Sequence, residues 1–254
     1  MNRTSDLTVT IIVPVLNEES TLIEVSRRLN SVLSVVAGHY LFEILFVDNG
    51  STDKSPQILR NLIDEGFPNT YSTRLLLQPK KGKGNAVRAA IKESTGVIVV
   101  IIDADLEYDL NELPQILGYH IGANAGMTLG SRHIGHFSSR EFLNSKILSV
   151  YFNLGHWFFT LMFNLLFQTR LTDPATMWKV MNGKMLRSFE LVGEGFELDW
   201  ELVAHFIRMK SDVIEVPVSY KSRTIKDGKK ISPIRDPLKW CIFIPYLRFR
   251  KIHQ

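Results

Sequence analysis

Five short apolar runs, separated by longer segments of mixed polarity, occupy the first half of the chain. Thr8–Val13 (TVTIIV) and Phe42–Val47 (FEILFV) are rich in β-branched and aromatic residues, and Val97–Ile102 (VIVVII) is wholly apolar. Runs of this length and composition are typical of strands that are covered on both faces of a sheet. Arg74–Leu77 and Met127–Leu129 predict two shorter strands.

Helical patterns fill most of the intervals between these strands. Apolar residues recur at steps of three and four along one early segment, at Leu22, Val25, Leu29 and Val32. Such spacing predicts an amphipathic helix. Ser55–Ile63, with Pro56 near its start, and Gly84–Ser94 predict two more helices. The alternation of strand and helix predicts an α/β fold with a parallel sheet covered by helices on both faces.

Carboxylates follow the predicted strands. Asp48 follows the second strand, and Asp103 and Asp105 follow the fourth, with Glu107 two residues later. Ligands of open parallel sheets bind beyond the carboxyl ends of the strands. Since residues two apart share a side of a strand, Asp103 and Asp105 can converge on one Mg²⁺ or Mn²⁺, with Glu107 as a third oxygen ligand. The alternative is a polar loop whose acids cap the next helix.

A basic glycine-containing loop, Lys80–Asn85 (KKGKGN), precedes the helix at Gly84. Its glycines allow close approach of the backbone to a ligand, and Lys81 and Lys83 bring positive charge, so the loop could hold a diphosphate. It lacks the spacing of a P-loop, and the alternative is a basic turn before a helix.

The middle of the chain is different, because no residue from Ile147 to Thr169 carries a formal charge. A polar stripe runs along this segment at steps of three or four: Ser149, Asn153, His156, Thr160, Asn164 and Gln168. The length would allow a bilayer span. The stripe favours a helix that packs on the domain or lies in a membrane interface. A second apolar run, Trp240–Leu247, is too short to span.

Composition adds a charge asymmetry. The chain of 254 residues has a net charge of +4, but the segment from Lys221 to Gln254 holds ten Lys or Arg and two Asp or Glu, hence +8, which leaves −4 for the rest. A basic end favours anionic partners such as phosphates or an anionic membrane, and the alternative is a solvated basic surface.

The single cysteine, Cys241, excludes a disulfide framework. The start of the chain lacks a signal-peptide layout, so we expect a cytoplasmic protein.

Four motifs, IIVPVLNEEST, LFVDNGSTDKS, KGKGNAVRAAI and VVIIDADLEYD, stand in this order along the chain. Together they resemble glycosyltransferase family 2, and within it the dolichol-phosphate mannose synthase-like, polyprenyl-phosphate glycosyltransferase subgroup. The resemblance is strong from Thr8 to Arg132 and weaker to about Lys230. It implies a GT-A fold, with a donor-binding half over residues 1–132, an acceptor-side half over 133–230 and a membrane-associated tail over 231–254. Amphipathic membrane-interface helices are expected in the C-terminal half.

The resemblance also implies roles for individual residues. Those that would line the nucleoside pocket are Pro14, Glu18 and Asp48. Asp103 would face the ribose or the outer shell of the metal, while Asp105 and Glu107 would hold the metal. Arg132 belongs to a GSR segment, Gly130–Arg132, whose arginine lies near the acceptor phosphate. Arg223 and Lys229 resemble a mobile basic loop that grips the donor diphosphate or the acceptor phosphate.

Several positions depart from the family pattern. Leu16 replaces a frequent aromatic residue, Asn49 a frequent Asp, and Glu107 a frequent Gln. The segment DPATMWKV, from Asp173, replaces the commoner D-x-x-S-G-F-R pattern, which leaves the acceptor open.

The resemblance implies a nucleotide-sugar donor and inversion at the anomeric carbon. Together with the basic tail and the uncharged segment, it leads us to expect metal-dependent transfer of a hexose to a polyprenyl phosphate at the cytosolic membrane face, with no nucleic-acid partner. A phosphate acceptor is already ionised, whereas a saccharide hydroxyl would need a base, for which Asp199 is the candidate; the alternative for Asp199 is a favourable acid at a helix N-terminus. Transfer to a saccharide hydroxyl, a nucleotidyltransferase and a non-catalytic scaffold remain alternatives. The sequence leaves the oligomeric state open.

Overall fold

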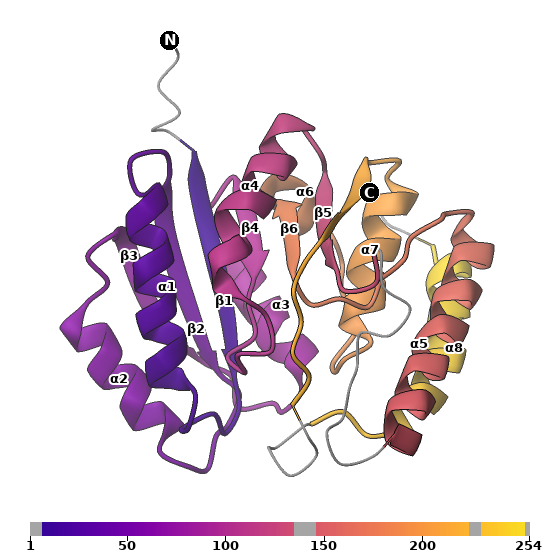
Figure 1. Ribbon diagram of the computed structural model, residues 1–254, viewed down its shortest axis with the longest axis horizontal. Coiled ribbons are helices and arrows are strands. Elements are labelled where there is room, and N and C mark those ends of the chain that lie inside the picture. Colours follow the sequence, from indigo (N-terminus) through magenta and orange to yellow (C-terminus); the bar gives the residue numbers. More distant parts are fainter. Residues whose placement is uncertain (1–6, 135–145, 224–229, 252–254) are drawn as a thin grey trace.

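The structure is a computed structural model that describes residues 7–134, 146–223 and 230–251, without the side chains of 146–149. Within these residues, seven strands form one mixed sheet. The strand order is β3-β2-β1-β4-β6-β5-β7 (Figure 1). The strands are β1 (Thr8–Val15), β2 (Leu41–Asp48), β3 (Thr70–Leu77), β4 (Ile98–Ile101), β5 (Met127–Ser131), β6 (Lys179–Asn182) and β7 (Val213–Pro217). The helices are α1 (Leu22–Val36), α2 (Ser55–Glu65), α3 (Lys83–Glu93), the 3₁₀ helix η2 (Leu110–Glu112), α4 (Leu113–Gly122), α5 (Lys146–Phe167), α6 (Gly183–Arg187), α7 (Leu198–Arg208) and α8 (Arg235–Phe249).

The first four strands pair as predicted. β1 lies parallel to β2 and β4, and β2 lies parallel to β3. Ile11, Phe46 and Val100 are fully buried, which explains the near-continuous apolar character of these strands. β6, which the sequence did not predict, runs antiparallel between β4 and β5, so the sheet is mostly rather than wholly parallel. Four residues carry too little periodicity to reveal such a strand in the sequence.

Helices cover both faces of the sheet. In Figure 1, α1 and α4 contact each other in front of the sheet, and α3 packs on β1 and β2 from behind. The predicted α/β class, with a mostly parallel sheet and helices on both faces, is therefore confirmed. The arrangement leaves the carboxyl ends of β1, β2 and β4 together at one edge.

The long uncharged segment forms α5, which packs alongside α8 at one end of the sheet (Figure 1). Among the described residues, one helix is long and apolar enough to cross a bilayer by length and composition, at Val150–Phe167, and a third of it (33%) is buried. Its Phe159, Phe163 and Phe167 belong to the hydrophobic core. These contacts favour the prediction that the helix packs on the domain.

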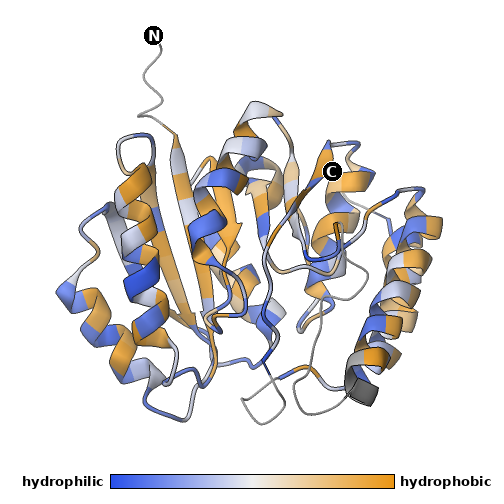
Figure 2. Cartoon of the chain, in the orientation of Figure 1, coloured by the Kyte–Doolittle hydropathy of each residue, from blue (hydrophilic) through white to orange (hydrophobic). Residues whose placement is uncertain are grey.

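The inward side of α5 carries polar residues of the stripe, His156, Thr160 and Asn164, beside the buried phenylalanines, and the outward side is apolar. Asn164 exchanges hydrogen bonds with the backbone of Leu171, and a ring nitrogen of His156 lies 3.0 Å from the carbonyl oxygen of Thr172. The opposite side of α5 exposes Leu154, Phe158, Leu161 and Leu165, and α8 exposes Leu238, Ile242 and Phe249. Figure 2 shows such apolar residues along both helices. We name these seven residues the α5–α8 apolar face.

Candidate active site

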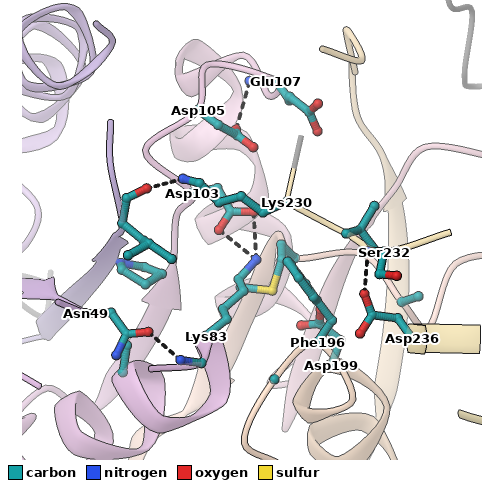
Figure 3. A pocket seen from close by; sticks show the side chains of 18 of the residues that line it. Asn49, Lys83, Asp103, Asp105, Glu107, Phe196, Asp199, Lys230, Ser232 and Asp236 are labelled. Carbon is teal, nitrogen blue, oxygen red and sulfur yellow. Dashed lines mark hydrogen bonds and ion pairs between the residues drawn. The ribbon is translucent and has the colours of Figure 1, made fainter. Parts of the chain in front are cut away.

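One cavity of about 1090 Å³ opens at the carboxyl ends of β1, β2 and β4. Its walls include the loops that follow β1, β2, β4, β5 and β7, the loop before α3, the segment before β6, and the starts of α7 and α8. Figure 3 shows Asp103, Asp105, Lys83 and Asp199 around this cavity. Asp103 and Asp105, on the loop after β4, both line the cavity.

Lys83 is held against Asp103 by the glycine loop. Gly82 has φ +122°, and a Cβ there would lie 2.2 Å from the carbonyl oxygen of Glu194, so a glycine is required for this close approach. The loop places Lys83 at the first residue of α3, where its Nζ lies 2.8 Å from Oδ1 of Asp103. Burial opposes the charge, but Asp103 and Asp199 outweigh it and raise the pKa of Lys83. Lys83 therefore keeps a positive charge inside the cavity.

The carboxyl of Asp105 has a strongly raised pKa in the cavity. Burial, together with the neighbouring charges of Asp103 and Glu107, raises its pKa to about 7, although Arg223 partly offsets the effect. Three carboxylates on one short loop are the hard oxygen donors that Mg²⁺ and Mn²⁺ prefer, and a bound divalent ion would relieve their mutual repulsion. The residues present therefore fit the predicted metal.

Basic side chains from the C-terminal half reach these acids. Arg223 pairs with both oxygens of Glu18, each at 3.0 Å, and its Nη2 lies 3.4 Å from Oδ2 of Asp105. Lys230 also pairs with Glu18. Glu107 accepts hydrogen bonds from the backbone of Arg223 and the hydroxyl of Tyr220, so it anchors this segment as well as facing the cavity. Arg223 thus lies between Glu18 and the acid cluster around Asp105.

The raised pKa of Asp105 predicts a pH-dependent metal affinity. Mn²⁺ must displace the proton that Asp105 carries below pH 7, so binding weakens as the pH falls. We expect the apparent Kd for Mn²⁺, measured by titration calorimetry without donor, to rise about tenfold between pH 8 and pH 6 for a single competing proton. Asp105→Asn should lose this dependence. A Kd that stays constant over this range would contradict the assignment.

Arg132, which also lines the cavity, lies in a buried ion pair. Its Nε and Nη2 lie 2.7 and 2.8 Å from the two carboxylate oxygens of Asp173, and Asp173 is fully buried. Burial opposes ionisation of Asp173, but Arg132 holds the pKa of that carboxyl well below its ordinary value. Because both oxygens of Asp173 are engaged, the pair orients the guanidinium that lines the cavity.

Two histidines beside this pair form a second set of candidate metal ligands, His133, His156 and Asp173. The two imidazole rings stack with centroids 3.8 Å apart and an interplanar angle of 11°. Lone pairs in the planes of nearly parallel rings do not converge on one ion, and Arg132 already neutralises Asp173. The geometry therefore favours the acid cluster around Asp105 as the metal site.

Asp199 lies in the first turn of α7 and lines the cavity, so both sequence interpretations of it describe its place. Burial raises its pKa, against the opposing charges of Lys179 and Lys83. Lys179 on β6 is fully buried, with its Nζ 3.4 Å from Asp199. Lys179 is a site residue that the sequence analysis did not identify. Its place in a short apolar segment was the available indication, since a buried lysine needs a partner for its charge.

The remaining predicted residues divide between the cavity and its surroundings. Pro14 and Lys81 line the cavity, whereas Asp48 ends β2, accepts a hydrogen bond from Ser51 N and is absent from the cavity wall. Asn49 is part of the wall instead, and its Oδ1 accepts a hydrogen bond from Gly82 N. Lys229 lies outside the described residues. The nucleoside role of Asp48 stays a prediction.

Known proteins resemble this chain in sequence. A family model described as glycosyl transferase family 2 matches residues 10–181. The undecaprenyl-phosphate 4-deoxy-4-formamido-L-arabinose transferase of Enterobacter sp. (strain 638) is 34% identical over 109 residues, 43% of this chain and 32% of that protein. The low-salt glycan biosynthesis hexosyltransferase Agl6 of Haloferax volcanii is 23% identical over 217 residues, 85% of this chain and 48% of that protein. The chain thus spans about a third of the length of the former relative and about half of the latter.

A solved structure has the same fold. Glucosyl-3-phosphoglycerate synthase from Mycobacterium tuberculosis, in complex with Mn²⁺, uridine diphosphate and glucosyl-3-phosphoglycerate, matches with a TM-score of 0.61 and 16% identity, covering 87% of this chain and 75% of that one. This likeness confirms the predicted GT-A fold. Since the family model extends over well more than half of the residues, the chain belongs to glycosyl transferase family 2.

Proposed function

We propose that this chain transfers a hexose, with inversion, from a nucleotide sugar to a polyprenyl phosphate at the cytosolic face of a membrane. The observation that carries the proposal is that one cavity joins the acid cluster to Arg132 and to the start of α8, beside the α5–α8 apolar face. A donor diphosphate fits the acids with their metal, and a phosphate on a lipid fits Arg132. The polyprenyl-phosphate relative supports this acceptor class.

The reaction follows from the charges around the cavity. An oxygen of the acceptor phosphate forms a bond to the anomeric carbon, while the bond from that carbon to the donor diphosphate breaks and its electron pair leaves with the diphosphate. A phosphate monoester is ionised at neutral pH, so no base is needed. Bound Mg²⁺ or Mn²⁺ would stabilise the charge on the leaving diphosphate. Lys83 and Arg223 are positioned to stabilise the same charge.

A saccharide acceptor is the second candidate, and Asp199 favours it. Asp199 lines the cavity, and burial raises its pKa, which makes its ionised form a stronger base for a sugar hydroxyl. A purely structural role, as an acid that stabilises the N-terminus of α7, also explains its position.

A donor and acceptor assay distinguishes these candidates. The full chain is mixed with Mn²⁺, a panel of radiolabelled nucleotide sugars, and either undecaprenyl phosphate in detergent or a set of oligosaccharides. Labelled lipid is the expected product. Labelled saccharide without labelled lipid would move the function to glycan synthesis, and release of pyrophosphate from a nucleoside triphosphate would indicate a nucleotidyltransferase.

The α5–α8 apolar face is the proposed contact with lipid. Its side chains point away from the core and are apolar, whereas the outward side of a helix on a water-facing surface is polar. Both helices carry or adjoin exposed basic residues: Arg170 follows α5, Arg235 and Arg248 lie in α8, and Lys251 follows α8. Such residues attract anionic headgroups. Peripheral attachment through this face would place the mouth of the cavity at the lipid surface.

Ile242→Glu is expected to weaken binding to vesicles of phosphatidylglycerol and phosphatidylcholine at least tenfold. The isoleucine is 75% exposed on α8, and a glutamate there would remove its apolar contact and repel anionic lipid. Vesicle sedimentation measures the effect. Ile23→Glu is the matched control, because Ile23 is 63% exposed on α1, far along the sheet from α8. Equal binding by both variants would contradict the proposed face.

A further inference from the structure

Tyr220 lies where the acid cluster and Arg132 approach each other in the cavity. It follows β7 and forms an isolated antiparallel bridge with Tyr108, in the loop after β4. The centroids of the two rings are 5.1 Å apart, and Lys221 N donates a hydrogen bond of 2.8 Å to the carbonyl oxygen of Glu107. The loop after β4 therefore holds the backbone and the ring of Tyr220 in place.

The hydroxyl of Tyr220 orients Glu107. It donates to Oε2 of Glu107 at 2.5 Å, while the backbone nitrogen of Arg223 donates to Oε1 at 2.7 Å. Each carboxylate oxygen can accept more than one bond, so Glu107 can still offer an oxygen to a cation. A group that hydrogen-bonds to a metal ligand fixes the direction of that ligand and tunes its affinity.

The ring of Tyr220 supports Arg132. The Cζ atom of Arg132 lies over the ring, 5.0 Å from its centroid, which is a cation–π contact. Asp173 pairs with Nε and Nη2 of the same guanidinium, so Nη1 is the end that this pair does not use. The ring and the carboxylate together limit the directions in which Arg132 can present its remaining N–H groups.

We propose that Tyr220 is a positioning residue that serves both halves of the reaction. Its hydroxyl sets Glu107 for the metal, and its ring sets Arg132 for the acceptor phosphate. The proposal rests on the proposed function, because the roles of Glu107 and Arg132 come from there. Since the two contacts use different parts of one side chain, two substitutions separate them.

Tyr220→Phe keeps the ring and removes the hydroxyl, whereas Tyr220→Leu removes both. For Tyr220→Phe we expect the Kd for Mn²⁺, measured by titration calorimetry without donor, to rise about tenfold with the KM for undecaprenyl phosphate unchanged. For Tyr220→Leu we expect the same rise in Kd and, in addition, a rise of about fivefold in that KM. Tyr220→Met replaces Tyr220→Leu if the latter does not fold.

Tyr119→Phe is the matched control, because Tyr119 is 51% exposed on α4 and does not line the cavity. A Kd for Mn²⁺ within twofold of the wild-type value in Tyr220→Phe would overturn the proposal. So would a fall in kcat and Tm in both variants with no separation between Kd and KM, which is the signature of a merely structural residue. Wild-type protein that neither binds Mn²⁺ nor labels lipid would instead overturn the proposed function itself.

Discussion

Asp105→Asn is expected to lower kcat/KM for hexose transfer about a thousandfold, because one missing contact to the charge of a transition state costs about two to three orders of magnitude. The amide keeps the size of the side chain but removes the charge that a divalent ion needs. Binding of Mn²⁺, measured by calorimetry, should fall with activity, while Tm should not. Burial raises the pKa of Asp105 to about 7, so the neutral amide relieves repulsion in the folded state.

Asp64→Asn is the control for this change, since Asp64 is an exposed acid on α2. It should retain full activity and full affinity for Mn²⁺. Turnover of Asp105→Asn within threefold of the wild-type value would contradict the metal site, and a non-catalytic scaffold would then account better for the chain.

Arg132→Met is expected to abolish transfer to lipid and to lower the free energy of unfolding by about 3–5 kcal/mol at pH 7. It leaves Asp173 fully buried without its counter-charge. Asp173 has a depressed pKa in the folded protein, so its stabilising contribution is present above its ordinary pKa and is lost as the pH falls through the folded value. The wild type therefore keeps this contribution down to the ordinary pKa of an aspartate, 3.8, and the difference in unfolding free energy between variant and wild type should narrow only at more acidic pH. Urea denaturation at several pH values measures it.

The double variant Arg132→Met/Asp173→Leu separates stability from function. Replacing a buried ion pair with apolar residues often leaves stability unchanged. The free energy of unfolding should therefore return close to the wild-type value, while transfer to lipid stays absent. Arg60→Met, at an exposed arginine of α2, is the control. Normal transfer by the double variant would show that Arg132 does not bind the acceptor.

The strongest sequence predictions depended on strand geometry. The apolar runs at β1, β2 and β4 identified buried parallel strands, and the two-residue spacing of Asp103 and Asp105 placed both acids at one strand end. Both inferences need only the local backbone period. The four motifs likewise identified the family, which the family model confirms over residues 10–181.

Other parts of the site could not be read from local patterns. Lys179 on β6 reaches Asp199 because β6 inserts between β4 and β5, a pairing across distant segments. Tyr220 reaches Glu107 across 113 positions of sequence. Contacts of this kind depend on chain topology, about which spacing along the sequence carries no information.

The α5–α8 apolar face illustrates the limit of prediction from local sequence patterns. The residue pattern predicted a polar stripe on an otherwise apolar α5, because residues three and four positions apart share one side of a helix. Which side of α5 faces inward depends on distant segments: Asn164 and His156 form hydrogen bonds with the backbone of Leu171 and Thr172, and Phe163 joins the hydrophobic core. Periodicity distinguishes the faces of a helix, but polar and apolar contacts with its neighbours select the one that is buried.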